Sequence, residues 1–188
     1  MKIKLFGSAF ISFGLILIAL LLYYQFLTNP GLNENVPLPV DLHPIVQQNK
    51  DTLIQQAADK GIRVMVTDGF RSFEDQDELY EKGRSVEGQI VTHAKGGESF
   101  HNFGLAIDFA LLTGEGKAIW DTAYDGNGNG KSDWMEVVTI AKELGFEWGG
   151  DWSHFKDYPH LEMRFGLSIN ELKRGKRPPG DSLTASQE

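Results

Sequence analysis

The chain has 188 residues, enough for one ordinary domain with an extension, and it carries a formal net charge of -8. This acidic balance argues against a nucleic-acid partner, which would favour a basic face. The sequence contains no cysteine, so disulfides, thiolate zinc sites and cysteine nucleophiles are excluded.

The N-terminal segment predicts a membrane anchor. Residues 1–4 contain two lysines, and residues 5–27 form an uncharged apolar run. At about 1.5 Å per residue, such a run can cross a hydrocarbon core of roughly 30 Å. The lysines favour a cytoplasmic N-terminus, which would make this a single-pass protein of the cell membrane with everything after residue 30 outside the cytoplasm. A cleaved signal peptide is the alternative, but residues 20–30 offer no small-residue cleavage site.

Downstream of the anchor, the sequence predicts a linker, one folded domain and a tail. Prolines punctuate the linker over 28–40, the domain covers 41–174, and the polar tail over 175–188 is expected to be disordered. Helices are expected at 46–60, 73–82, 135–144 and from the capping Ser168 to 174, and strands at 62–67, near Ile90, at 104–110 and at 160–165. Helices and short alternating strands without a regular βαβ rhythm predict an α+β fold.

The stretch 99–108 holds the first candidate functional group. His101 and Asp108 lie seven positions apart, and the residues up to Asp108 alternate like a strand. One face of this strand is bulky, whereas the other carries only Gly104, Ala106 and the carboxylate of Asp108. Small neighbours would leave open space around the carboxylate, which suits a bound ion or substrate.

A second histidine is expected on the same side of the sheet. His160 opens an alternating strand whose odd positions would face the core, so it would face the open side together with Asp108. If these strands are neighbours, two imidazoles and one carboxylate could bind Zn²⁺ and leave a fourth position for water. Asp157 precedes His160 by three residues, and the stiff Pro159 between them could hold it one water away as a base. The alternative is that these histidines are simply hydrogen-bonded.

These motifs together resemble a known family. The run Ser99-x-His101-x-x-Gly104-x-Ala106-x-Asp108, the later Asp157-x-x-His160, and the segments 69–76 and 148–152 are similar to the zinc peptidases of the D-Ala-D-Ala carboxypeptidase and L-alanyl-D-glutamate endopeptidase family. The resemblance covers residues 40 to 166. It implies a single small domain with a central antiparallel sheet, of the type found in hedgehog proteins and DD-peptidases.

The resemblance also implies roles for individual residues. His101, Asp108 and His160 would be the zinc ligands, and Asp157 the base that activates water and returns the proton to the leaving amine. Arg71 resembles the arginine that faces the scissile carbonyl, where a fixed cation in a water-poor cleft stabilises developing negative charge.

Three further residues could contact substrate. Ser99 would lie near the substrate, or alternatively would cap a turn. Trp148 and Trp152 could form a cleft wall for a peptide stem, or alternatively could pack in the core.

A second metal site is suggested by the segment 125–136, which fits the twelve-position calcium loop of EF-hands. The loop positions that would supply ligands are Asp125, Asn127, Asn129, Lys131, Asp133 and Glu136. No entering helix is predicted, so this would be a lone Ca²⁺ loop. The alternative is a polar turn that caps the next helix.

The sequence therefore predicts a membrane-anchored, monomeric zinc peptidase that cleaves peptidoglycan stem peptides, at the L-Ala–D-Glu bond, by metal-activated water. A D-alanyl-D-alanine carboxypeptidase is the alternative within this class. A non-catalytic wall-binding module on the same fold, and more distantly a calcium-dependent adhesin, are the alternatives from other classes.

Overall fold

The computed structural model of the chain describes residues 4–28 and 31–180, with the side chains of residues 14–27 and 31–180. The start of the predicted cytoplasmic segment and residues 181–188 of the predicted tail lie outside the described residues. Residues 175–180 of that tail are held on the domain, because the Arg177 guanidinium donates to the backbone carbonyls of Pro37 and Leu172, each at 2.9 Å.

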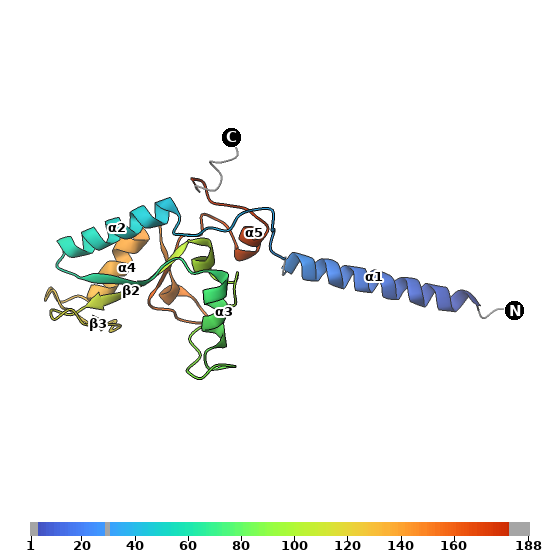
Figure 1. Cartoon of the computed structure of the whole chain (residues 1–188), viewed down its shortest axis with the longest axis horizontal. Coiled ribbons are helices and arrows are strands. Elements are labelled where there is room, and N and C mark those ends of the chain that lie inside the picture. The colour runs from blue at the N-terminus through green and yellow to red at the C-terminus, as the bar shows by residue number, and fades with distance from the viewer. Residues whose placement is uncertain (1–3, 29–30, 181–188) are drawn as a thin grey trace.

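Helix α1 (Lys4–Thr28) projects away from the rest of the chain (Figure 1). A membrane-spanning helix requires about 20 consecutive apolar residues. In the part of the chain that the structure describes, no helix combines the length and the apolarity needed to cross a membrane. This finding contradicts the predicted single-pass location, and the predicted anchor over 5–27 has no support.

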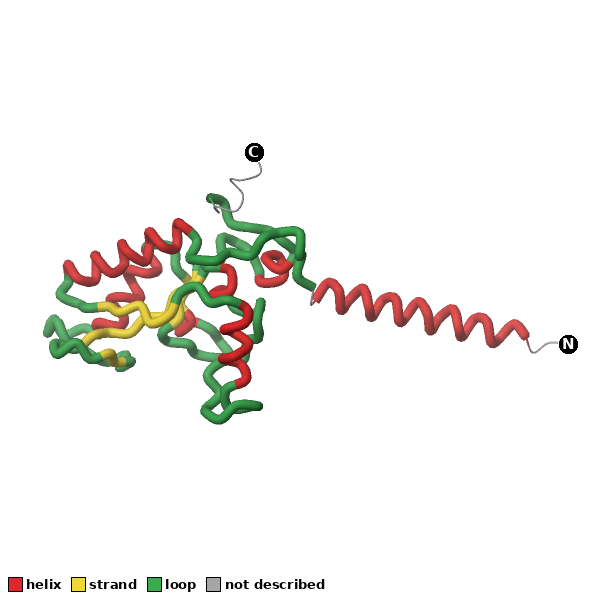
Figure 2. The backbone as a smooth tube through the Cα atoms, viewed as in Figure 1, coloured by secondary structure: helices red, strands yellow, loops and turns green. Residues whose placement is uncertain are grey.

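The remaining elements form a small α+β domain, as predicted. Its helices are α2 (Pro44–Asp59), α3 (Phe73–Glu81), α4 (Asp133–Glu143), α5 (Ile169–Lys173) and the short 3₁₀ helices η1 (Phe100–Phe103) and η2 (Gly149–Asp151). Its strands are β1 (Val64–Asp68), β2 (Ala106–Leu112), β3 (Ala118–Ile119), β4 (Glu147–Trp148) and β5 (His160–Glu162). The sheet is antiparallel with the order β1-β2-β5-β4, and β3 pairs with β2. The strands are the yellow segments of the backbone tube in Figure 2.

Local capping explains where three of the helices begin. Ser72, Ser132 and Ser168 each accept a backbone N–H of the first helical turn through their hydroxyl oxygens. The predicted strand near Ile90 is wrong, since the structure describes residues 87–99 without a strand. The predicted strand at 160–165 is shorter than expected and ends at Glu162.

The core lies between one face of the sheet and the helices α2 and α4. Leu105, Ile107 and Phe109 point to this side, and the Phe109 ring stacks 4.3 Å from the Trp134 ring of α4. Alternation then places the side chain of Asp108 on the opposite face of β2. The bulky face of β2 is thus packed in the core, and its other face is left for the polar side chains described below.

Candidate metal centre and cleft

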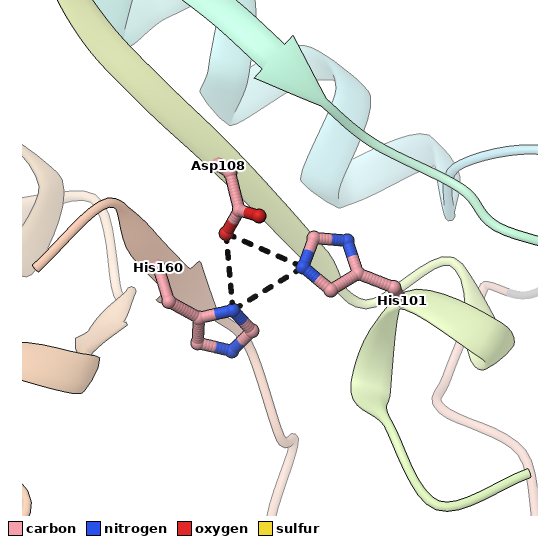
Figure 3. A group of neighbouring side chains, drawn as sticks. All are labelled: His101, Asp108 and His160. Atoms are coloured by element: carbon pink, nitrogen blue, oxygen red, sulfur yellow. Dashed lines mark hydrogen bonds and ion pairs between the residues drawn. The ribbon is translucent and has the colours of Figure 1, made fainter. Parts of the chain in front are cut away.

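Three side chains from separate elements converge at the centre of the sheet. His101 comes from η1, Asp108 from β2 and His160 from β5, and their ligand atoms point toward one another (Figure 3). The Asp108 Oδ1 atom lies 3.3 Å from His101 Nε2 and 3.2 Å from His160 Nδ1, and the two imidazole nitrogens are 3.2 Å apart. The sheet register places Asp108 directly opposite His160, so the two side chains share one face.

This donor set fits a tetrahedral zinc ion. Ligand atoms at about 2.0–2.1 Å from a tetrahedral Zn²⁺ are roughly 3.3 Å from one another. All three separations among the nitrogen and oxygen atoms match that spacing. In the described part of the chain, this is the one group of three or more histidine and carboxylate side chains that could hold a metal ion.

The segment before β2 presents His101 through a tight capped turn. Ser99 and Asn102 form a capping box around η1, and Gly104 leaves it with a φ of +67°, a left-handed conformation that suits glycine. A Cβ on Gly104 would also meet the backbone of Asp41. The His101 Nδ1 atom lies 2.6 Å from the Gly69 carbonyl oxygen, so Nδ1–H donates to it and Nε2 faces Asp108.

Burial and mutual hydrogen bonds shift the pKa values of the group in opposite directions. Burial opposes ionisation of Asp108, yet hydrogen bonds from His101 and His160 hold its pKa well below the usual range. Burial also opposes a charged His160, but hydrogen bonds to Asp108 and Glu162 outweigh it and raise the pKa of His160 to about 9. The site therefore stabilises positive charge on this face, as a cation-binding site should.

Asp157 lies beside this group without belonging to it. Its backbone carbonyl accepts the His160 N–H at 3.3 Å, and its N–H donates to the Gly149 carbonyl at 3.2 Å. A Cβ on Gly149 would clash with the Asp157 carbonyl and lie 3.1 Å from His160 Cβ, so only glycine allows this close packing. Burial, and then the charge of Asp108, raise the pKa of Asp157, which favours a role in proton transfer.

Arg71 is fixed by two partners on the other side of the cleft. Its guanidinium pairs with Asp68 and donates to Gln76 Oε1 at 2.7 Å. Gln76 is fully buried and donates in turn to the Ala94 carbonyl at 2.8 Å, which ties Arg71 to the cleft wall. The Arg71 N–H also donates to the His101 carbonyl at 3.2 Å. Sequence reasoning did not identify Asp68 or Gln76 as partners of Arg71.

A cleft of about 830 Å³ opens over the group, and both Arg71 and Asp157 line it. Ser99 lines the cleft too, but its hydroxyl accepts the His101 N–H at 3.3 Å, as in the predicted alternative of a turn cap. Trp152 forms part of the wall, with its ring 5.2 Å from that of His160. Trp148 is buried in the core, and the prediction that it lines the cleft is wrong.

The predicted calcium loop folds as a hydrogen-bonded turn. The Asp125 carboxylate accepts the N–H groups of Asn129 and Gly130, and the side-chain amides of Asn127 and Asn129 donate to Glu136. At the other predicted ligand positions, the Asp133 carboxylate accepts the N–H of Gly126 and the Lys131 N–H donates to the side-chain oxygen of Asn129. Ser132 caps α4, in line with the alternative of a helix-capping turn. The calcium site has no support in these contacts and stays a prediction.

Glu162 is a residue of the site that sequence reasoning missed. It lies on β5 two positions after His160, and its carboxylate oxygen is 3.0 Å from His160 Nε2. The sequence pattern could have indicated this residue, because residues two apart on a strand share one face. A carboxylate beside a candidate ligand on the same face is a candidate partner of that ligand.

The chain is similar in sequence to known peptidoglycan peptidases. A family model described as D-alanyl-D-alanine carboxypeptidase matches residues 92–163. The chain is 68% identical over 130 residues to the peptidoglycan L-alanyl-D-glutamate endopeptidase CwlK of Bacillus subtilis (strain 168), which covers 69% of this chain and 78% of the relative. It is 34% identical over 141 residues to the L-alanyl-D-glutamate peptidase of Listeria phage A118, covering 71% of this chain and 44% of that protein. Among solved structures, the L-Ala D-Glu endopeptidase ChiX of Serratia marcescens has 23% identity and a TM-score of 0.38, over 67% of this chain and 91% of that one.

Proposed function

Because the chain belongs to the family of peptidoglycan peptidases that includes D-alanyl-D-alanine carboxypeptidases and L-alanyl-D-glutamate endopeptidases, we propose that it is a zinc-dependent endopeptidase that hydrolyses the L-alanyl–D-glutamate bond of peptidoglycan stem peptides. The observation that carries the proposal is the convergence of His101, Asp108 and His160 at the floor of a cleft lined by Asp157 and Arg71. We propose that the peptidase domain spans residues 41–174.

Different residues of the cleft would carry out different parts of the reaction. A zinc ion held by His101 Nε2, Asp108 Oδ1 and His160 Nδ1 would supply Lewis acidity and lower the pKa of a bound water. Asp157 accepts the proton of the attacking water and delivers it to the leaving amine. Arg71, held by Asp68 and Gln76, faces the negative charge that develops on the scissile carbonyl oxygen.

Digestion of purified peptidoglycan with the zinc-loaded protein tests this function. Mass analysis of the muropeptides should show new N-terminal D-glutamate, and the same digestion after zinc chelation should show none. Loss of terminal D-alanine would instead establish the alternative, a D-alanyl-D-alanine carboxypeptidase. Binding to the wall with no cleavage in the presence of zinc would establish a non-catalytic module.

Zinc affinity is expected to rise with pH. In the metal-free protein His160 has a pKa of about 9, so below this pH zinc must displace one proton from the imidazole. The apparent affinity should therefore rise about tenfold per pH unit from pH 7 toward 9 and level off above. Calorimetric titration in two buffers of different ionisation enthalpy measures the released proton. An affinity independent of pH over this range would show that zinc displaces no proton from His160, against its raised pKa.

Replacing Ala106 by leucine is expected to impair the site more than the fold. Ala106 is fully buried and lies opposite Glu162 in the sheet, on the face that carries Asp108 and His160. The larger side chain must displace Glu162, at a cost of about 1–3 kcal/mol in unfolding free energy. Activity should fall at least tenfold while thermal unfolding remains cooperative. Wild-type hydrolysis by Ala106→Leu would show that this face is not turned toward the metal.

A further inference from the structure

The two histidines present different nitrogens to the candidate metal centre. His101 offers Nε2 and holds the Gly69 carbonyl with Nδ1, whereas His160 offers Nδ1 and turns Nε2 away from the group. The His160 Nε2 atom lies within hydrogen-bond distance of a carboxylate oxygen of Glu162, at 3.0 Å. One histidine is thus held by a neutral backbone acceptor and the other by an anion.

Glu162 is placed for this contact by its own strand β5 and by the neighbouring strand β2. Its side chain is 2% exposed, a location where an ionised carboxylate is costly unless partners compensate it. Ala106 stands directly opposite on β2, and its single methyl group leaves room for the longer side chain. The second carboxylate oxygen accepts from Arg164, whose Nε lies at 2.7 Å and NH2 group at 2.5 Å.

We propose that Glu162 is a positioning residue of the metal centre, which orients His160 by accepting its Nε2–H and keeps the Nδ1 lone pair aimed at the ion. The inference rests on the proposed zinc site. A histidine ligand needs its ring fixed in one tautomer and one orientation, and a carboxylate on its other nitrogen provides both while making the ligand atom more basic. Arg164 in turn holds the Glu162 carboxylate in place from the solvent side.

Glu147 offers a matched control on the neighbouring strand. It lies opposite Glu162 in the β4–β5 register and pairs with the same Arg164, at 3.3 Å from its Nε. Its side chain is 55% exposed, however, and it makes no contact with His160 among the hydrogen bonds and ion pairs of the described residues. Neutralising Glu147 therefore removes a partner of Arg164 without touching the ligand.

The test measures metal binding by the full-length protein, independently of peptidase activity. Zinc affinity is measured by competition with a chromophoric chelator for wild type, Glu162→Gln, Glu162→Ala and Glu147→Gln. We expect affinity to fall about tenfold in Glu162→Gln and up to about 100-fold in Glu162→Ala, since loss of such partners costs 10–100-fold. Glu147→Gln should bind zinc like the wild type.

Two further readouts separate positioning from a general loss of structure. Substitution with Co²⁺ should give visible absorption bands that shift in Glu162→Gln and not in Glu147→Gln, and thermal unfolding of the metal-free proteins reports their stability. Equal zinc affinity and unshifted bands in Glu162→Gln would overturn the inference, as would an equal loss in Glu147→Gln. If the wild type itself bound no zinc, the proposed function would fail together with this inference, whereas tight wild-type binding with an unaffected Glu162→Gln would overturn the inference alone.

Discussion

Replacing Asp157 by asparagine should lower kcat by about 10³-fold while zinc binding is retained. The substitution keeps the size of the side chain but removes the group that would take the proton from water, and general bases contribute about 10²–10⁴-fold. Asp157 lies outside the group of three ligand atoms, so its loss leaves them intact. Steady-state hydrolysis of a stem peptide and chelator competition for zinc measure the two effects separately.

Asp151 provides the control for this variant. It lies in the same segment, is 55% exposed at its side chain and pairs with Lys142 at 2.6 Å, away from the cleft lining. Asp151→Asn should therefore hydrolyse the peptide at the wild-type rate. If Asp157→Asn retained more than a tenth of the wild-type kcat, Asp157 would not be the base.

The pH profile gives a second check on Asp157. The carboxylate must be ionised to act as a base, and its pKa is raised by burial and by the charge of Asp108. Activity should therefore be lost as pH falls and this carboxylate takes up a proton. Asp157→Asn should lack this acidic limb in its residual activity.

Local rules predict the faces on which Asp108 and His160 lie, but not the pairing of their two strands. Alternation in two strands fixes the face on which Asp108 and His160 lie, and the antiparallel pairing of β2 with β5 then sets them opposite one another. The predicted cap at Ser168 likewise depends on residues within one helical turn, and helix α5 begins directly after it.

What could not be predicted depends on contacts between segments distant in sequence. The small side chain of Ala106 indicated open space, but the structure fills that space with Glu162 from β5. Trp148 and Trp152 lie four positions apart with similar neighbours, yet the indole N–H of Trp148 donates to the Tyr158 carbonyl within the core, whereas Trp152 reaches the cleft. Neither difference can be predicted without knowing which strands are neighbours in the sheet.

The partners of Arg71 were not predicted although they lie within five residues of it in the sequence, and they bear on the second large effect. The Arg71 side chain is 13% exposed and its guanidinium is held between Asp68 and Gln76, so its orientation is set before substrate binds. Preorganised donors contribute to catalysis because they require no reorientation as charge develops. Lysine keeps the charge but offers no planar fork to satisfy both partners at once.

Arg71→Lys should therefore lower kcat by about 10²–10³-fold, equivalent to about 2.7–4 kcal/mol of transition-state stabilisation. KM should change less, and zinc affinity should be unchanged, because no ligand atom is altered. The variant should also be less stable in denaturant titration by about 1–3 kcal/mol, since the buried Gln76 Oε1 loses its Arg71 donor.

Arg84→Lys separates the role of Arg71 from a general effect of this substitution. Arg84 also contacts the 92–94 segment, through a hydrogen bond of 3.1 Å to the Thr92 carbonyl, but it does not line the cleft. Its replacement should leave kcat unchanged. If Arg71→Lys lost stability and kept its kcat, the Asp68–Arg71–Gln76 network would serve the fold alone, and the charge on the scissile carbonyl would have to be met by another group of the cleft.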